Sequence, residues 1–313
     1  MVKISVGQLY DYNRGRLDLS WICGHREAQI AAPDGPHFAA DLIGHLNLIH
    51  AARLQVFGSA EIQWWQAQPI DATRRYLQEM LSGAPPAFIV ADGMDPPPLV
   101  RYACEREQVP LMASAKSSSA VVDQLRSYLG RVLAPKQSLH GVFMDVLGMG
   151  ALITGDSGVG KSELALELIS RGHGLVADDI VEVARIAPNV LEGSCPPLLK
   201  DFLEVRGLGI LNIRTVFGES ACRRRMRLRL VIHLHKSQPG MPEATRLPLD
   251  AETHQILGVE VRRVIIPVAA GRNLAVLAEA AVRTTILQLR GIDTTLEFVE
   301  RQQQALGDQD AMH

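Results

Sequence analysis

The sequence predicts an α/β protein of two domains, and three observations lead to this prediction. Residues 155–162, Gly-Asp-Ser-Gly-Val-Gly-Lys-Ser, fit the G-x-x-x-x-G-K-[ST] pattern of a phosphate-binding loop. Strand-like apolar runs alternate with helix-like segments over residues 54–133. A polar segment with a proline, residues 134–138, separates these two parts. We therefore expect a small α/β domain over residues 1–133 and a phosphate-loop domain over residues 134–313.

Composition narrows the class of protein. The chain has 313 residues, 47% hydrophobic and 21% charged, a balance typical of folded domains with an apolar core. Its formal net charge of -2 argues against nucleic acid as a partner. Four scattered cysteines, Cys23, Cys104, Cys195 and Cys222, lack zinc-like spacing and predict free thiols in a reducing compartment. No signal-like start or membrane-length apolar run occurs, so we expect a cytoplasmic protein without a membrane partner.

The first domain is expected to contain parallel strands joined by helices. Residues 1–20 alternate weakly (Val2, Ile4 and Val6) and then become polar around residues 11–14, whereas residues 42–49 fit either helix or strand. Further strands are predicted at residues 54–58, 87–91 and 110–113, and helices at residues 73–81, 98–107 and 117–133. The domain contains no clustered catalytic residue types, so assembly, regulation or ligand sensing are its expected roles.

The second domain is expected to be built around the phosphate loop. His140 begins a predicted strand that ends at Val146 and forms a hairpin with the strand leading into the loop. A short helix follows the loop, and the next strand ends at Asp178 and Asp179. Strands are also predicted at residues 180–186, 190–191 and 225–232, and helices at residues 273–290 and in the tail after Asp293. The arginines of 223–229 are expected to be solvated or to face another subunit.

The loop and the two aspartates predict phosphate chemistry. Glycines allow consecutive backbone N–H groups to converge on phosphate oxygens, and the following helix N-terminus favours negative charge. Lys161 supplies a cation for the β- and γ-phosphates, and Ser162 supplies a hydroxyl for Mg²⁺. Because successive side chains of a strand point to opposite faces, we expect Asp178 and Asp179 to divide between the magnesium ion and the acceptor hydroxyl. The chain is therefore expected to bind a nucleoside triphosphate.

For other residues, the sequence pattern alone gives weaker evidence of a functional role. Glu204 is a second possible metal ligand, because it stands in an unusual run of apolar residues and glycines. A lone histidine such as His140 is more often structural than catalytic. His233 and His235 share one strand face, but no third ligand accompanies them, so we reject a zinc site.

Four segments together resemble the HPr kinase/phosphorylase family. They are residues 140–142 (His-Gly-Val), the phosphate loop, residues 176–179 (Val-Ala-Asp-Asp) and residues 204–212 (Glu-Val-Arg-Gly-Leu-Gly-Ile-Leu-Asn). The last segment closely resembles the signature of that family, and the resemblance extends over nearly the whole chain. It implies a bifunctional enzyme of carbon metabolism that phosphorylates a serine of the phosphocarrier protein HPr with ATP and removes the phosphate by phosphorolysis, yielding pyrophosphate. It also implies a homohexamer and a C-terminal P-loop kinase domain similar to the nucleotide-binding core of phosphoenolpyruvate carboxykinases.

The resemblance also implies roles for particular residues. His140, Lys161, Asp179 and Arg246 correspond to active-site residues, and Asp178 joins them at the same strand end. Ser162 and Glu204 correspond to magnesium ligands. The nucleotide-binding residues are Gly155, Asp156, Ser157, Gly158, Val159, Gly160, Lys161 and Ser162. The segment that the family associates with dephosphorylation is Pro267, Val268, Ala269, Ala270, Gly271 and Arg272.

The dephosphorylation segment departs from the pattern of the family. Ala269 and Ala270 stand where many members have a basic residue and a proline, which leaves the segment less positively charged. Two other functions remain open at this stage. One is a P-loop kinase of a small metabolite, and the other is a nucleotide-sensing regulatory protein with little turnover.

Overall fold

The structure is a computed structural model that describes residues 2–32, 42–236, 252–269 and 271–310. The chain divides into two compact units, Met1–Pro135 and Lys136–His313. No helix among the described residues is both long enough and apolar enough to span a membrane.

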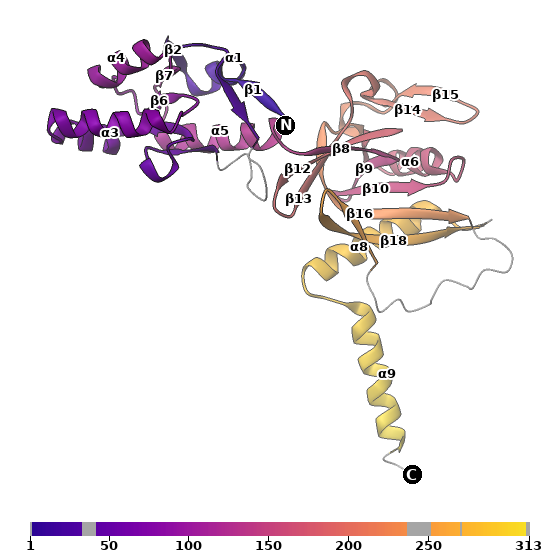
Figure 1. Ribbon diagram of the computed structural model, residues 1–313. Coiled ribbons are helices and arrows are strands. Elements are labelled where there is room, and N and C mark those ends of the chain that lie inside the picture. The colour runs from indigo at the N-terminus through magenta and orange to yellow at the C-terminus, as the bar shows by residue number, and fades with distance from the viewer. Residues whose placement is uncertain (1, 33–41, 237–251, 270, 311–313) are drawn as a thin grey trace. The chain divides into compact units, whose positions relative to one another are not determined.

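The N-terminal unit consists of short strands and helices in alternation (Figure 1). In chain order they are β1 (Lys3–Ser5), α1 (Val6–Leu17), β2 (Leu19–Cys23), β3 (Gln29–Ala31), β4 (Ile43–His45), the 3-10 helix Leu48–His50, β5 (Leu54–Phe57), α2 (Ser59–Ala67), α3 (Ile70–Ser82), β6 (Phe88–Val90), α4 (Pro98–Glu107), β7 (Leu111–Ser114) and α5 (Ser118–Val132).

A five-stranded sheet with the order β2-β7-β6-β5-β4 forms the centre of this unit. Strands β4 to β7 are parallel and β2 is antiparallel, which confirms the predicted parallel pairing. Helices α1 and α5 contribute to the core on one face, and α2, α3 and α4 to the core on the other. Trp65 is 5% exposed in the second core, where its ring meets that of Phe57, whereas Trp64 is 44% exposed. Both faces of the sheet are therefore covered, as a parallel sheet requires.

Helix α1 continues through the polar residues 11–14, although the weak alternation of residues 1–20 did not indicate a helix. The helix begins with a capping box: the Ser5 hydroxyl accepts from the Gln8 backbone N–H at 3.1 Å, and the Gln8 side chain accepts from the Ser5 N–H at 2.9 Å. Asn13 is buried, and its amide donates to the Leu9 carbonyl. The ambiguous segment 42–49 contains both alternatives in part, since β4 is followed by a 3-10 turn.

The C-terminal unit contains a larger set of strands and four α-helices within the described residues (Figure 1). In chain order the elements are β8 (Lys136–His140), β9 (Val142–Val146), β10 (Met149–Gly155), α6 (Lys161–Ser170), β11 (Gly174–Ala177), β12 (Ile180–Ala187), β13 (Val190–Ser194), the 3-10 helix Pro197–Leu199, β14 (Phe202–Val205), β15 (Gly209–Asn212), α7 (Ile213–Phe217), the 3-10 helix Glu219–Ala221, β16 (Arg225–Lys236), β17 (Thr253–Ile256), β18 (Val259–Val268), α8 (Leu274–Leu289) and α9 (Thr294–Asp310).

Parallel strands bring distant parts of this unit to one edge of its sheet. The strand order is β11-β9-β10-β16-β13-β12-β8, and β18 pairs with the second half of β16. Strand β9 is antiparallel to both β11 and β10, so β11 runs parallel to β10, as do β16 and β18. The segments that follow β10, β11 and β18 therefore leave the sheet at the same edge. These are the phosphate loop, the pair Asp178–Asp179 and Ala269.

The two faces of this sheet are packed differently. Helices α6 and α8 cover one face and share a core with apolar residues of β9, β10 and β16. On the other face, the core joins residues of β9 and β10 to residues of β12, β13 and β17, so the sheet curls over itself. Gly193 of β13 makes this approach possible, because a Cβ at this position would lie 2.4 Å from Cε1 of Phe143. The predicted hairpin of β9 and β10 is confirmed.

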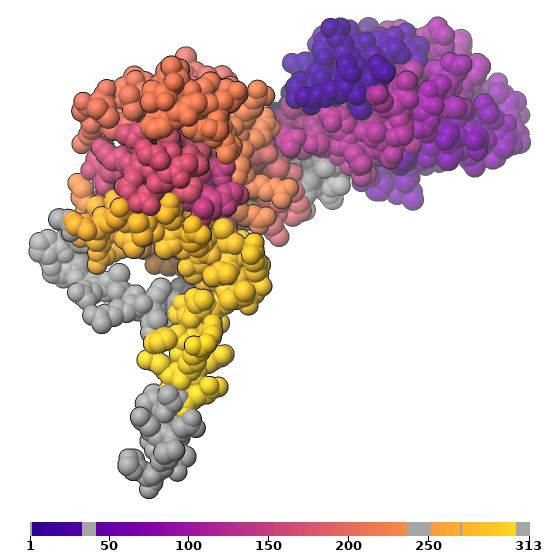
Figure 2. All heavy atoms as spheres, turned by 180° about the vertical axis from the view of Figure 1, so that it is seen from behind, coloured from indigo at the N-terminus to yellow at the C-terminus, as the bar shows by residue number. Residues whose placement is uncertain are grey.

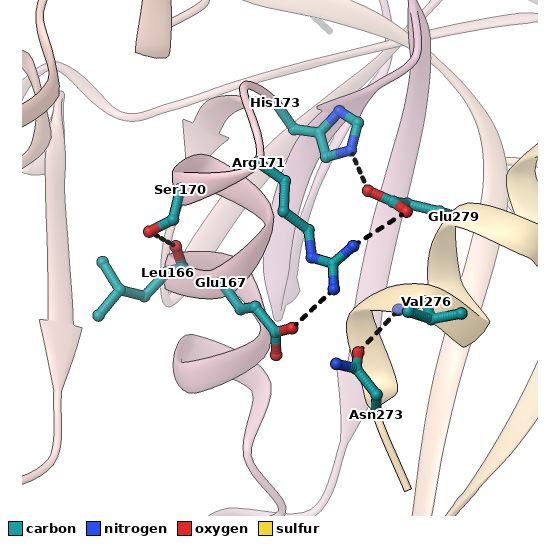
Figure 3. A network of polar contacts seen from close by, with 8 residues as sticks. All are labelled: Leu166, Glu167, Ser170, Arg171, His173, Asn273, Val276 and Glu279. Carbon is teal, nitrogen blue, oxygen red and sulfur yellow. Dashed lines mark hydrogen bonds and ion pairs between the residues drawn. The ribbon is translucent and has the colours of Figure 1, made fainter.

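Helix α6 is held between the segment that contains β14 and helix α8. Figure 2 shows this layer from outside, with the rose atoms of α6 between the orange segment and the yellow α8. Glu279 of α8 accepts hydrogen bonds from His173 Nε2 at 2.9 Å and from Arg171 Nη1 at 3.4 Å, and Arg171 also pairs with Glu167 (Figure 3). His173 and Arg171 follow α6 directly. The end of α6 opposite the phosphate loop is therefore tied to α8.

Candidate active site

The phosphate loop connects β10 to α6, as predicted from the sequence. Three of its glycines have positive φ angles, 140° at Gly155, 72° at Gly158 and 102° at Gly160. These values lie in or near the region that residues with a side chain avoid, which explains why glycines occupy the bends of the loop. Val159 is 4% exposed and anchors the loop in the core beneath α6. The glycines thus set the bends of the loop, and Val159 fixes it on the core.

Lys161 lies over this loop. Its Nζ donates to the carbonyl oxygens of Gly155 and Asp156, at 3.0 Å each. Because both acceptors belong to the start of the loop, the ammonium group lies within the curve that the loop forms. An anion entering that curve would meet a cation and the N-terminal end of α6.

Asp178 is buried at the end of β11. Its side chain is 8% exposed, and Oδ2 accepts the Glu204 backbone N–H at 2.9 Å. Burial raises the pKa of Asp178, and the neighbouring carboxylates of Asp179 and Glu204 act in the same direction, while the hydrogen bond from Glu204 N–H opposes them. Asp178 thereby joins β14 to the end of β11.

Asp179 lies beside His140. Its φ angle of 64° is left-handed, and its side chain projects into solvent, with Oδ1 3.1 Å from Nδ1 of His140. The Gly141 N–H also donates to the Asp179 carbonyl at 3.1 Å. His140 is the last residue of β8, opposite Ile180 of β12, so the prediction that it begins a strand is wrong. The assumption that Asp178 and Asp179 point to opposite faces of a strand is also wrong, because both follow β11 and border the same cavity, whereas their division between the magnesium ion and the acceptor stays a prediction. They differ instead in burial.

The sites predicted from separate segments meet in one cavity of about 180 Å³. It is lined by residues from β8, the phosphate loop, α6, the end of β11 and the hairpin of β14 and β15: His140, Gly141, Ser157, Gly158, Gly160, Lys161, Ser162, Glu163, Asp178, Asp179, Glu204 and Arg206. The cavity thus combines two cations, four carboxylates and a phosphate loop.

Arg206 was missed as a site residue. A Cβ on Gly158 would lie 2.8 Å from Nη1 of Arg206, so the guanidinium group reaches the phosphate loop. Two sequence signals could have found it: Arg206 stands two residues after Glu204, and it belongs to the segment 204–212 that resembles the family signature. Glu163 and Gly141 were also missed.

The segment associated with dephosphorylation is described in part. Pro267 and Val268 end β18, Gly271 has a φ angle of 80°, and Arg272 precedes Asn273, the N-cap residue of α8. Within the described residues, this segment starts at the same sheet edge as the phosphate loop but does not line the cavity. Arg246 and Ala270 lie outside the described residues.

A larger hollow of about 760 Å³ lies elsewhere in this unit, between the turn after β9, the start of β16 and the end of α8. Arg225, Arg227, Arg229 and Arg290 border it, so the predicted charged strand face is partly recessed. Its position at the start of β10 places it at the other end of that strand from the phosphate loop. The smaller cavity is therefore the candidate active site, because the phosphate-binding geometry lies there.

The oxygen donors of the cavity fit a magnesium ion. The Ser162 hydroxyl and the carboxylates of Asp178 and Glu204 border the same space, and Mg²⁺ prefers one or two carboxylates together with phosphate oxygens. No group of three or more His, Cys, Asp or Glu side chains suited to a metal occurs among the described residues. His233 instead contacts the Thr154 hydroxyl at 3.0 Å below the phosphate loop, where burial lowers its pKa.

Comparison with known proteins identifies the family. The family model described as HPr Serine kinase N terminus matches residues 4–129, and the one described as HPr Serine kinase C-terminal domain matches residues 131–302. The chain belongs to the HPr serine kinase family. The resemblance stated from the sequence is thereby confirmed.

Relatives within the HPr serine kinase family match along the full length of the chain. The HPr kinase/phosphorylase of Aromatoleum aromaticum is 59% identical over 306 residues, covering 98% of each chain. That of Azoarcus sp. strain BH72 is 59% identical over 313 residues, covering 100% of each chain. A solved structure of the Hpr(Ser) kinase/phosphatase from Coxiella burnetii is 37% identical and covers 52% of this chain and 98% of the other, with a TM-score of 0.46.

Proposed function

We propose that this protein is an HPr kinase/phosphorylase. It transfers the γ-phosphate of ATP to a serine of HPr, and it removes that phosphate with inorganic phosphate to give pyrophosphate. The observation that carries the proposal is the convergence of the phosphate loop, Lys161, Asp178, Asp179, Glu204 and His140 on one cavity. The family assignment and the names of full-length relatives support the choice of HPr as acceptor.

The phosphate loop and Lys161 bind the triphosphate. Backbone N–H groups at the N-terminus of α6 and the ammonium of Lys161 attract the phosphate oxygens, so Lys161 exchanges its two carbonyl partners for phosphate. Ser162 and Glu204 would hold Mg²⁺, which supplies neutralisation of charge on the β- and γ-phosphates. Arg206, close to Gly158, adds a second cation at this rim.

Asp179 acts on the acceptor. Its carboxylate is exposed, unlike that of Asp178, and His140 Nδ1 lies 3.1 Å from its Oδ1, so an N–H there orients the carboxylate and leaves its other oxygen available. That oxygen accepts the proton of the seryl hydroxyl in phosphorylation and returns a proton to the seryl oxygen in phosphorolysis. Asp178 is a positioning residue, since its burial and its bond to the Glu204 N–H hold the hairpin against the site.

Phosphorolysis places two anions together, and the segment from Pro267 to Arg272 is proposed to help hold them. Arg272 offers a guanidinium group at the start of α8, whereas Ala269 offers no charge. Arg246 is proposed as a further active-site residue. We also propose a homohexamer in the cytoplasm, with the N-terminal unit serving assembly or regulation. Free thiols at all four cysteines agree with a reducing compartment.

The test follows the label of γ-phosphate. The purified chain is incubated with Mg²⁺, γ-labelled ATP and HPr, and inorganic phosphate is then added. The proposal predicts label on a serine of HPr, followed by its release as pyrophosphate. Label on a small metabolite would instead indicate a metabolite kinase, and binding of ATP without turnover would indicate a nucleotide sensor. Sedimentation of the same sample measures the number of subunits.

A further inference from the structure

We propose that the hairpin of β14 and β15 is a docking surface for an apolar patch beside the target serine of HPr. This inference rests on the proposed function and adds the part of the protein that recognises the acceptor. It is carried by the position of the exposed aliphatic side chains Leu208 and Ile210 relative to Glu204.

The two faces of the hairpin differ in burial. Leu203 and Val205 are 0% and 4% exposed and belong to the core beneath α6. The opposite face carries Phe202 and Ile210, which are 40% and 71% exposed. The buried face fixes the hairpin on the unit, so the exposed side chains lie on a firm support rather than on a loose loop.

Ile210 is the cross-strand partner of Glu204, which lines the active-site cavity. In the antiparallel register Glu204 lies opposite Ile210, and residues opposite each other project from the same face of a hairpin. Glu204 lines the cavity, so the aliphatic side chain of Ile210 stands beside the carboxylate at its rim.

The tip of the hairpin presents Leu208. The Leu208 N–H donates to the Val205 carbonyl at 3.1 Å, which closes a β-turn with Gly207 at the left-handed position, φ 83°. Gly209 on the other side has φ 85°, so Leu208 is held between two glycines in conformations that few other residues adopt. Leu208 is 64% exposed. The turn therefore places the apolar side chain of Leu208 in solvent.

The occupant follows from the adjacent chemistry. A serine on a folded protein enters the cavity only when the surrounding protein surface rests on the rim, and the hairpin forms part of that rim. Burying aliphatic side chains against an apolar partner surface is favourable, whereas a small metabolite would leave them in water. The partner is therefore the protein acceptor itself, with an apolar surface next to its serine.

The experiment compares Leu208→Gln and Ile210→Thr with Leu289→Gln. Leu289 is a matched control because it is 62% exposed and lies at the end of α8, outside the cavity. For each variant, kcat and KM are measured with HPr at saturating Mg-ATP. Mg-ATP binding without HPr, the unfolding temperature and the sedimentation coefficient are measured in parallel.

The inference predicts that each hairpin variant raises KM for HPr about tenfold, equivalent to roughly 1.4 kcal/mol, while kcat, Mg-ATP binding and sedimentation stay unchanged. Leu289→Gln stays within about twofold of the wild type. An unchanged KM would refute the docking surface. If KM for HPr rises and Mg-ATP binding weakens by the same factor, the side chains serve the shape of the site. If sedimentation changes, they contact a second copy of the chain. Either result would overturn the docking surface. If the wild type transfers no label to HPr, the proposed function itself fails, and this inference fails with it.

Discussion

The contact between α6 and α8 can be tested through Glu279. Glu279 is 19% exposed and accepts from His173, which is 8% exposed, and from Arg171. Replacing Glu279 by Ala leaves the His173 N–H without its acceptor in a nearly buried place. Glu279→Gln keeps an acceptor and removes only the charge.

The magnitude follows from these contacts. An unsatisfied buried donor costs about 1–3 kcal/mol, and loss of the charge alone costs roughly half as much. Arg171 adds little, because its side chain is 34% exposed and also pairs with Glu167. For a unit of this size, Glu279→Ala is expected to lower the unfolding temperature by roughly 2–12 °C, and Glu279→Gln by about half of that.

The assay is thermal unfolding across pH, with Glu297→Ala as the control for an exposed pair, Glu297 with Arg301. The hydrogen bond from His173 is the main reason that the pKa of Glu279 is lowered. The contribution of Glu279 is therefore complete above its unfolded-state pKa of about 4.3 and disappears as the pH falls through its folded value. The deficit of Glu279→Gln should stay constant from about pH 8 to 5.5 and shrink below about pH 4.3. If Glu279→Ala costs no more than Glu297→Ala, the argument from burial is refuted.

Four further predictions concern the active site. Lys161→Ala should lower both phosphorylation and phosphorolysis of HPr by at least about 10²-fold, and near-normal rates in either direction would contradict a single phosphate site. Asp179→Asn keeps a residue type that tolerates a left-handed φ and should lower both rates by about 10²–10⁴-fold; loss of Mg-ATP binding would reassign Asp179 to the metal. Arg272→Ala should impair phosphorolysis more than phosphorylation, and Ala269→Arg should favour phosphorolysis, most clearly at low salt; equal losses of both rates in Arg272→Ala would exclude a role in direction. Because burial raises the pKa of Asp178, its protonated form is favoured in the folded state and its stabilising contribution is lost as pH rises. Asp178→Asn should therefore raise the unfolding temperature at pH 7 more than at pH 4, and a decrease at pH 7 would show that the charge is needed for the fold.

Local patterns predicted most of the elements of the fold. The phosphate loop was recognisable because its glycines, lysine and serine serve one bend of the backbone within eight residues. The polar residues before Asn13 hid α1, although Ser5 and Gln8 had the spacing of a capping box. The alternation rule failed at Asp179 because it assumes extended backbone, and a left-handed residue redirects the chain there.

The site was harder to predict than the fold, because its residues meet through the sheet rather than through neighbouring positions. His140 and Asp179 are brought together by the pairing of β8 with β12, which no local pattern encodes. Glu204 was selected from its glycine-rich surroundings and from the resemblance to the family. Arg206 was missed because its approach to Gly158 depends on how the hairpin turns over the phosphate loop.

The order of strands also has a consequence for how the chain folds during its synthesis. Strand β10 lies between β9, its neighbour in sequence, and β16, whose paired residues come more than seventy positions later, from Leu228 to Leu234. During synthesis the phosphate loop therefore emerges long before the strand that supports its far side. Contacts between residues so far apart in the sequence form slowly, because closing the intervening chain costs conformational entropy. A nascent chain that ends before β16 has the whole loop sequence but lacks its support, so the ability to hold ATP arises late and marks a completed domain.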